Sequence, residues 1–115
     1  MPDRELDVLQ GTLDLLVLRA LRTGPMHGYS VLDWLKRATA GELRLEDAAL
    51  YPALHRLEAR GHIESSWGLS ENNRRARYYE LTTKGRRRLK AETATWERYA
   101  TLMARVLGSV EGGAP

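Results

Sequence analysis

Residues 47–61 read DAALYPALHRLEARG, and this stretch predicts the helix around which the rest of the chain can be arranged. Leu50, Leu54 and Leu57 recur at helical spacing and form one apolar stripe, which is typical of a helix that packs one side on a core. The stretch begins with an aspartate, a residue type favoured at an N-cap, and ends with a glycine, which is favoured just beyond a helix C-terminus. We therefore expect one helix to span it.

The side of this helix opposite the leucines suits contact with DNA. Its small residues permit close approach to a groove, and its tyrosine, histidine and arginine side chains can donate hydrogen bonds to phosphates or base edges. The alternative is an ordinary solvated face, which would normally carry more glutamate and lysine. The candidates for DNA contact on this helix are Ala48, Ala49, Tyr51, Pro52, His55 and Arg56.

Downstream, the pattern changes to that of a β-hairpin. Residues 63–67 and 76–81 are short runs with β-branched and aromatic content, and a turn-rich segment separates them. Arginine can bind a phosphate through two hydrogen bonds, and an exposed hairpin tip can reach a minor groove. A charged edge strand that prevents aggregation is the alternative interpretation. The candidates for DNA contact on the hairpin are Asn72, Asn73, Arg74, Arg75 and Arg77.

Two further helices are predicted upstream. Residues 13–21 read LDLLVLRAL and are apolar on two sides. In so short a chain, we expect a partner subunit to cover the second side, which carries Leu15 and Leu18. Another helix is expected over residues 28–38, and His27 immediately before it is expected to cap or pack against it.

Thr82 or Thr83 is expected to cap a long final helix, which carries a coiled-coil seam. Its stripe from Leu89 to Val110 follows the alternating i+4, i+3 spacing of a heptad repeat, which is typical of pairing between two chains. The residues expected at a dimer interface are Leu15, Leu18, Leu89, Thr93, Trp96, Ala100, Met103 and Leu107.

Trp96, in the middle of this seam, has two interpretations. The first is a large apolar residue that anchors the interface. The second is an effector site, in which a flat aromatic molecule stacks between Trp96 and its symmetry-related copy. Thr93 and Ala100 lie one turn to either side and are small enough to leave space for such a molecule.

The order helix, helix, helix, strand, strand, helix predicts an α+β, mainly α fold. It is that of a winged helix-turn-helix, three helices plus a β-hairpin wing, with a long C-terminal dimerisation helix added. We expect the DNA-binding domain over residues 1–82, the dimerisation helix over 83–107 and a flexible glycine-rich tail over 108–115.

Composition and charge favour nucleic acid as the partner and exclude several other classes. The 115-residue chain has a net charge of +3, and its cations concentrate in residues 74–90, where Glu80 alone opposes them. It has no cysteine, its histidines lack metal-ligand spacing, and it shows no nucleophile elbow, phosphate loop or apolar carboxylate pair. We therefore expect no catalytic residue, cofactor or metal. Without a signal peptide or membrane span, a cytoplasmic location and no membrane partner are expected.

Three motifs resemble the PadR-like transcriptional regulators. They are Met26-His27-Gly28-Tyr29, then ALYPALHRLE at residues 49–58, then RYYELT at residues 77–82 with Gly85. The single C-terminal helix is similar to the smaller PadR subclass. WGLSENNRRA at residues 67–76 looks most like members found beside ABC-type permease genes.

The resemblance implies a winged-helix homodimer that binds double-stranded DNA at palindromic promoter elements. Most such proteins repress, and some release DNA when they bind small phenolic or drug-like molecules. Carried over, Tyr51, Pro52 and His55 lie at the major groove, residues 73–75 form the wing tip, and Trp96 lies at the dimer pore. Where the family usually has Gly-Ser or Gly-Thr, this chain has alanines at positions 48 and 49, and so lacks a hydroxyl that could contact DNA or cap the helix.

Two functions from other classes remain as alternatives to a DNA-binding repressor. One is a small-molecule sensor that binds a planar aromatic effector at Trp96. The other is a protein-interaction module that places its basic face on an acidic partner.

Overall fold

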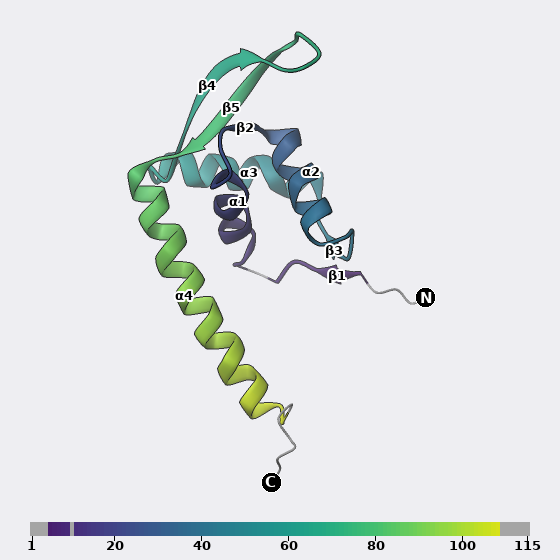
Figure 1. Cartoon of the computed structure of the whole chain (residues 1–115), viewed down its shortest axis with the longest axis vertical. Helices are drawn as coiled ribbons and strands as arrows, with labels where there is room; N and C mark the ends of the chain where they lie inside the picture. Colours follow the sequence, from purple (N-terminus) through teal and green to yellow (C-terminus); the bar gives the residue numbers. More distant parts are fainter. Residues whose placement is uncertain (1–4, 10, 109–115) are drawn as a thin grey trace.

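The computed structural model describes residues 5–9 and 11–108. Its elements follow the order of a winged helix-turn-helix, which confirms the predicted α+β, mainly helical fold. They are β1 (Leu6–Asp7), α1 (Leu13–Leu21), β2 (Met26–His27), α2 (Gly28–Ala38), β3 (Leu43–Arg44), α3 (Asp47–Ala59), β4 (Ile63–Leu69), β5 (Arg75–Leu81) and α4 (Thr83–Val106). Figure 1 shows α1, α2 and α3 gathered into one body, with the β4–β5 hairpin rising from it as a wing and α4 running away on the other side.

The short strands of the fold were not predicted. β1 pairs in parallel with β3, and β2 adds to the edge of β5, so that the larger sheet has the order β2-β5-β4. Two-residue strands carry no periodicity, because each exists only through its pairing with a distant segment. The predicted hairpin is confirmed and is longer than expected, since the antiparallel ladder continues outward as far as the pair Leu69 and Arg75.

The core lies where α1 meets the other three helices and β5. The predicted stripe of α3 is buried in it, as are Tyr79 and Leu81 of β5. Leu18 is only 1% exposed and Leu89 only 5%, so both are covered by this chain's own core. Their expected place at a dimer interface is therefore wrong, because this chain already buries both side chains, whereas Leu15 on the same side of α1 as Leu18 is only partly buried.

Hydrogen bonds fix the start of α4 to the end of α3. Thr82, at the N-cap of α4, accepts a hydrogen bond from the backbone N–H of Gly85 at 3.0 Å, as predicted for a capping threonine. The same hydroxyl donates to the carbonyl of Gly61 at 2.7 Å, and Lys84 Nζ donates to the carbonyl of Arg60 at 2.8 Å. The carbonyls at the α3 C-terminus, which have no partner within the helix, are thus satisfied by α4.

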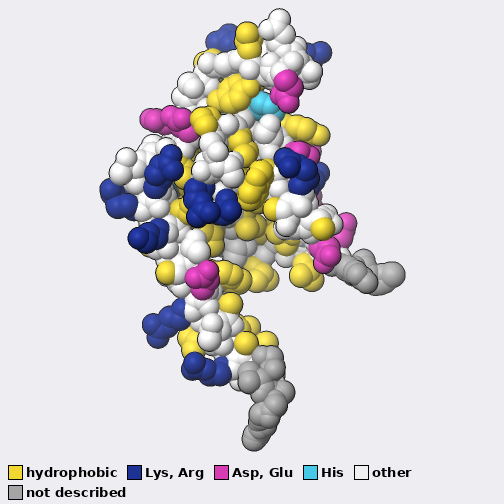
Figure 2. Space-filling view, in the orientation of Figure 1, with side chains coloured by type: hydrophobic (Ala, Val, Ile, Leu, Met, Phe, Trp, Pro, Cys, Tyr) yellow, Lys and Arg dark blue, Asp and Glu magenta, His cyan; other side chains and the backbone are white. Residues whose placement is uncertain are grey.

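Beyond these first turns, α4 extends away from the body and exposes apolar side chains. Their positions recur at i+3 and i+4 spacing along one side of the helix. They are Trp96, Tyr99, Leu102, Met103, Val106 and Leu107. Figure 2 shows hydrophobic side chains along the part of α4 that leaves the body and along the lower edge of the body itself. Tyr99, Leu102 and Val106 lie outside the predicted seam, and Val110 and the tail from residue 109 lie outside the described residues.

None of the helices within the described ranges is long and apolar enough to cross a lipid bilayer.

Candidate nucleic-acid interface

The outer side of α3 is exposed and carries the residues expected there. Ala48, Pro52 and His55 face solvent, while Leu50 and Leu54 are buried beneath them. Because the helix turns about 100° per residue, position 51 lies on the flank next to the wing. The side of α3 that faces away from the core therefore carries small residues and little charge, with a histidine at its centre.

Tyr51 fits against the start of α2 in a way that only a glycine permits. A Cβ atom at Gly28 would lie 2.6 Å from the Tyr51 hydroxyl oxygen, so the ring occupies the space that a side chain would fill. His27 caps α2, its Nδ1 accepting a hydrogen bond from the backbone N–H of Ser30 at 3.2 Å, which confirms the expected capping role. Tyr29 beside it is exposed and was not among the predicted contacts, although its motif had been noted.

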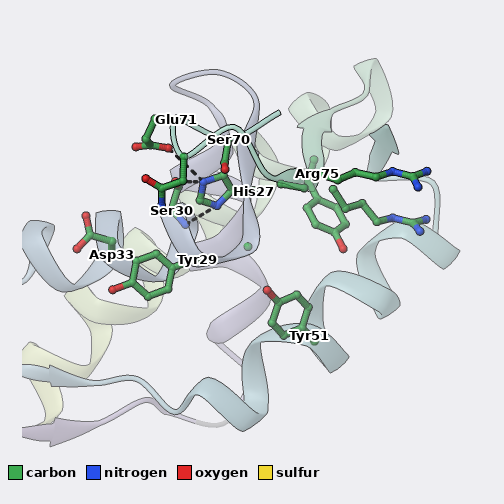
Figure 3. A pocket seen from close by; sticks show the side chains of 13 residues that line it. His27, Tyr29, Ser30, Asp33, Tyr51, Ser70, Glu71 and Arg75 are labelled. Atoms are coloured by element: carbon green, nitrogen blue, oxygen red, sulfur yellow. Dashed lines mark hydrogen bonds and ion pairs between the residues drawn. The ribbon is translucent and has the colours of Figure 1, made fainter. Parts of the chain in front are cut away.

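A groove of about 670 Å³ lies between the start of α2, the start of α3 and the wing. Tyr29 and Tyr51 line one side of it, and Asn72, Arg75 and Arg77 line the other. Figure 3 shows His27, Ser30 and Glu71 converging at its upper edge, Tyr51 below, and Arg75 extending away from them along the wing. Residues from three separate segments of the chain thus border one concave surface.

The wing face that continues above α3 carries a tryptophan between arginines. Trp67 pairs across the hairpin with Arg77, and Leu69 with Arg75, so all four side chains lie on one face of the sheet. The guanidinium carbon of Arg75 lies 4.4 Å from the centre of the Trp67 ring, and that of Arg77 lies 5.7 Å from it. Two of the arginines predicted to contact DNA, Arg75 and Arg77, therefore lie over one indole ring, an arrangement that the sequence does not reveal.

Hydrogen bonds shape the tip of the wing. The backbone N–H of Asn73 donates to the carbonyl of Ser70 at 2.8 Å, and Asn73 adopts a φ of 59°, a left-handed conformation that asparagine tolerates. Asn72, Asn73 and Arg74 are exposed there, as predicted. Glu71 lies 3.7 Å from His27 Nε2, which joins the tip to the start of α2.

Arg56 is turned away from this surface. It lies on the flank of α3 that faces α1, where its Nη2 atom is 2.6 Å from the carboxylate of Asp14. That hydrogen bond raises the pKa of Arg56 above its ordinary value. Arg56 therefore lies away from the groove, because its guanidinium is engaged by an acid 42 residues earlier in the chain, a pairing that the sequence does not reveal.

The basic run of residues 74–90 divides between two surfaces. Arg74, Arg75 and Arg77 lie on the wing, while the cations from residue 84 onward lie on the first turns of α4. Figure 2 shows Lys and Arg side chains gathered around the start of α4. A continuous basic segment of sequence thus becomes two separate basic patches, because Thr82 ends the strand and begins the helix.

Comparison with known proteins identifies the family. Residues 17–91 match the sequence profile of the transcriptional regulator PadR-like family. The chain belongs to this family of DNA-binding regulators. The resemblance drawn from its motifs is thereby confirmed, and the regulators of this family are not enzymes.

Solved structures of regulators share the fold of this PadR-like protein. A PadR family transcriptional regulator from Eggerthella lenta is 32% identical, with a TM-score of 0.73 over 85% of this chain and 83% of that one. A transcriptional regulator from Clostridium thermocellum is 28% identical, with a TM-score of 0.76 over 84% of this chain and 91% of that one. A PadR family regulator from Clostridium difficile is 27% identical, with a TM-score of 0.73 over 85% of this chain and 100% of that one.

The described part of the chain contains no group of three or more His, Asp or Glu side chains that could hold a metal ion.

Proposed function

We propose that this PadR-like regulator represses transcription as a homodimer on a palindromic operator, in the cytoplasm. Each α3 enters a major groove, and each wing contacts the flanking sugar–phosphate backbone. The single observation that carries the proposal is that α3, the start of α2 and the wing arginines all line one groove. A helix whose outer side carries small, exposed residues fits a major groove, and cations beside the helix can contact the phosphates at the edge of that groove.

The proposed DNA contacts are those predicted from the sequence, without Arg56. Tyr29 is added, because it is exposed at the same groove. The contacts are Tyr29, Ala48, Ala49, Tyr51, Pro52, His55, Asn72, Asn73, Arg74, Arg75 and Arg77.

The salt dependence of DNA binding tests the role of the wing. An operator is first obtained by selection from random duplexes, and its affinity is measured from about 50 to 200 mM salt. Replacing both Arg74 and Arg75 with alanine should lower affinity similarly on all duplexes and make the slope of log K against log salt shallower by about 0.9 for each lost phosphate contact. Replacing Lys36 and Arg37, exposed at the end of α2, removes the same charge away from the groove and serves as the control. An unchanged slope in the wing variant would remove the wing from the mechanism.

The exposed apolar side of α4 supports the dimer. Trp96, Tyr99 and Met103 lie in water in the isolated chain, and burial against a second copy would remove that surface from solvent. Two α3 helices held by such a pair would reach successive major grooves about 34 Å apart. A Met103→Glu variant should sediment as a monomer, whereas Thr101→Glu, exposed on the opposite side of α4, should remain a dimer. A dimeric Met103→Glu protein would contradict pairing through this surface.

Repression itself is tested by transcription from a promoter that contains the selected operator. The regulator should lower transcript output, and increased output would identify an activator instead. If the protein binds no duplex even at low salt, the basic face would be assigned to an acidic protein partner.

A small-molecule sensor is the second candidate, and one observation favours it. Trp96 is 38% exposed and its ring lies 6.1 Å from that of Tyr99, so α4 presents two adjacent aromatic rings. A planar effector would quench Trp96 fluorescence in a protein whose Trp34 and Trp67 are replaced with phenylalanine. No quenching across a panel of planar compounds would leave Trp96 as an interface residue only.

A further inference from the structure

Trp67 is unusually exposed for a tryptophan, the residue type with the largest side chain. It lies on the outer part of the wing and is 57% exposed, beyond the part of β4 that packs on the core. On that face, the guanidinium groups of Arg75 and Arg77 lie over its ring. The indole therefore contributes little to the core, and its cation–π contacts are with the two arginines.

Stacking leaves an arginine free to bind phosphate. A guanidinium that lies over an aromatic ring uses its planar face, while its N–H donors point outward in the plane and remain available. Arg77 uses some of these donors, with Nε bonded to Ser65 Oγ at 2.9 Å and Nη2 lying 3.5 Å from Glu58. Within the described residues, the Arg75 guanidinium has no side-chain acceptor at hydrogen-bond distance. Arg75 is thus oriented by the ring and has its donors open to solvent.

We propose that Trp67 is a positioning residue for DNA binding, which holds the two wing arginines, Arg75 above all, in the orientation that meets a phosphate. This inference rests on the proposed function and adds a residue that it does not contain. An unrestrained arginine loses rotamer freedom when it binds, so an arginine that is already ordered on the ring loses less and binds more tightly. Trp67 itself need not touch the DNA.

The test compares two replacements of the ring. Trp67→Leu keeps an apolar side chain and removes the aromatic face, whereas Trp67→Phe keeps an aromatic face. Affinity for the selected operator should fall about five- to tenfold in Trp67→Leu and stay within about twofold in Trp67→Phe, as expected for the loss of cation–π contacts to two arginines. Leu69→Ala is the matched control, because Leu69 is exposed on the same wing face opposite Arg75 and should leave affinity unchanged.

The salt slope separates positioning from charge. Trp67→Leu removes no charge, so its slope should equal that of the unmodified protein, while Arg75→Ala should make the slope shallower by about 0.9. Unfolding by urea in the absence of DNA checks that each variant is folded. Unmodified affinity in Trp67→Leu, or equal losses in Trp67→Leu and Trp67→Phe, would overturn the inference. Absence of duplex binding by the unmodified protein would instead refute the proposed function.

Discussion

Replacing Gly85 with alanine should destabilise the protein even though alanine is the better helix former. Gly85 lies in the first turn of α4, where that helix crosses the chain just after α3. A Cβ atom there would lie 1.9 Å from the backbone carbonyl oxygen of His62. The obstacle is a backbone atom, so no change of rotamer can relieve it.

The magnitude follows from two effects of opposite sign. Helix propensity alone would favour alanine by about 1 kcal/mol. Relief of the clash requires a separation of 3.4 Å, where ordinary contact begins, instead of 1.9 Å, a shift of about 1.5 Å. Overpacking that moves backbone costs up to about 3 kcal/mol, and strain in the two hydrogen bonds from Thr82 to the carbonyls of Gly61 and His62 adds about 1 kcal/mol in total. We expect a net loss of about 2–3 kcal/mol in the free energy of unfolding.

Thermal and urea unfolding at one fixed protein concentration measure this loss. A loss of this size lowers Tm by about 10–20 °C in a domain of this length. Thr95→Ala, at an exposed position of α4, is the control and should be neutral or slightly stabilising. If Gly85→Ala proves as stable as the unmodified protein, the close crossing of α4 over His62 is not a constraint and the reasoning fails.

Three further changes test the interface and its support. Gly28→Ala should displace the exposed Tyr51 ring and weaken operator binding up to about tenfold. The free energy of unfolding in urea should change little, because a side chain and not the backbone must move. A large loss of stability would contradict this prediction. His62 is 7% exposed, and its pKa is lowered mainly by burial and also by nearby cations. As the pH falls, histidine in the unfolded chain is therefore protonated at a higher pH than His62 in the folded protein, so the free energy of unfolding should fall as the pH drops below about 6.5. His62→Gln should flatten that dependence in unfolding curves from pH 7.5 to 5.5, and the exposed control His55→Gln should not. Tyr78→Phe removes the hydrogen bond to the Leu69 carbonyl at 2.7 Å and should cost about 1 kcal/mol of unfolding free energy, with no loss indicating that water replaces it.

Much of the fold could be predicted from local patterns. The helix spans, the hairpin and the capping threonine follow from apolar periodicity and from residue types whose preferences act within a few positions. The Asp47 N-cap was wrong, because Glu46 occupies that position and its side chain makes no capping bond. A cap shifted by one residue is the kind of error that local preference allows.

Some site residues were also misplaced or missed. The roles of Leu18 and Arg56 were predicted from the pattern of a single helix in each case. The structure buries Leu18 in the core and pairs Arg56 with Asp14, and both contacts involve other segments of the chain. Trp67 was overlooked because an aromatic residue in a strand usually packs on a core. Its stacking with arginines arises only when β4 and β5 pair in register.

The sequence by itself determined the order of elements, the apolar side of α3 and the supply of arginines to the wing, because these depend on spacing along the chain. Tertiary structure alone decided which cations remain available, since ion pairing and stacking join residues far apart in sequence. It also decided that Leu18 of α1 is covered within the chain, and that large apolar side chains are exposed along the outer part of α4. Burial is a property of how the segments pack together, and no single segment encodes it.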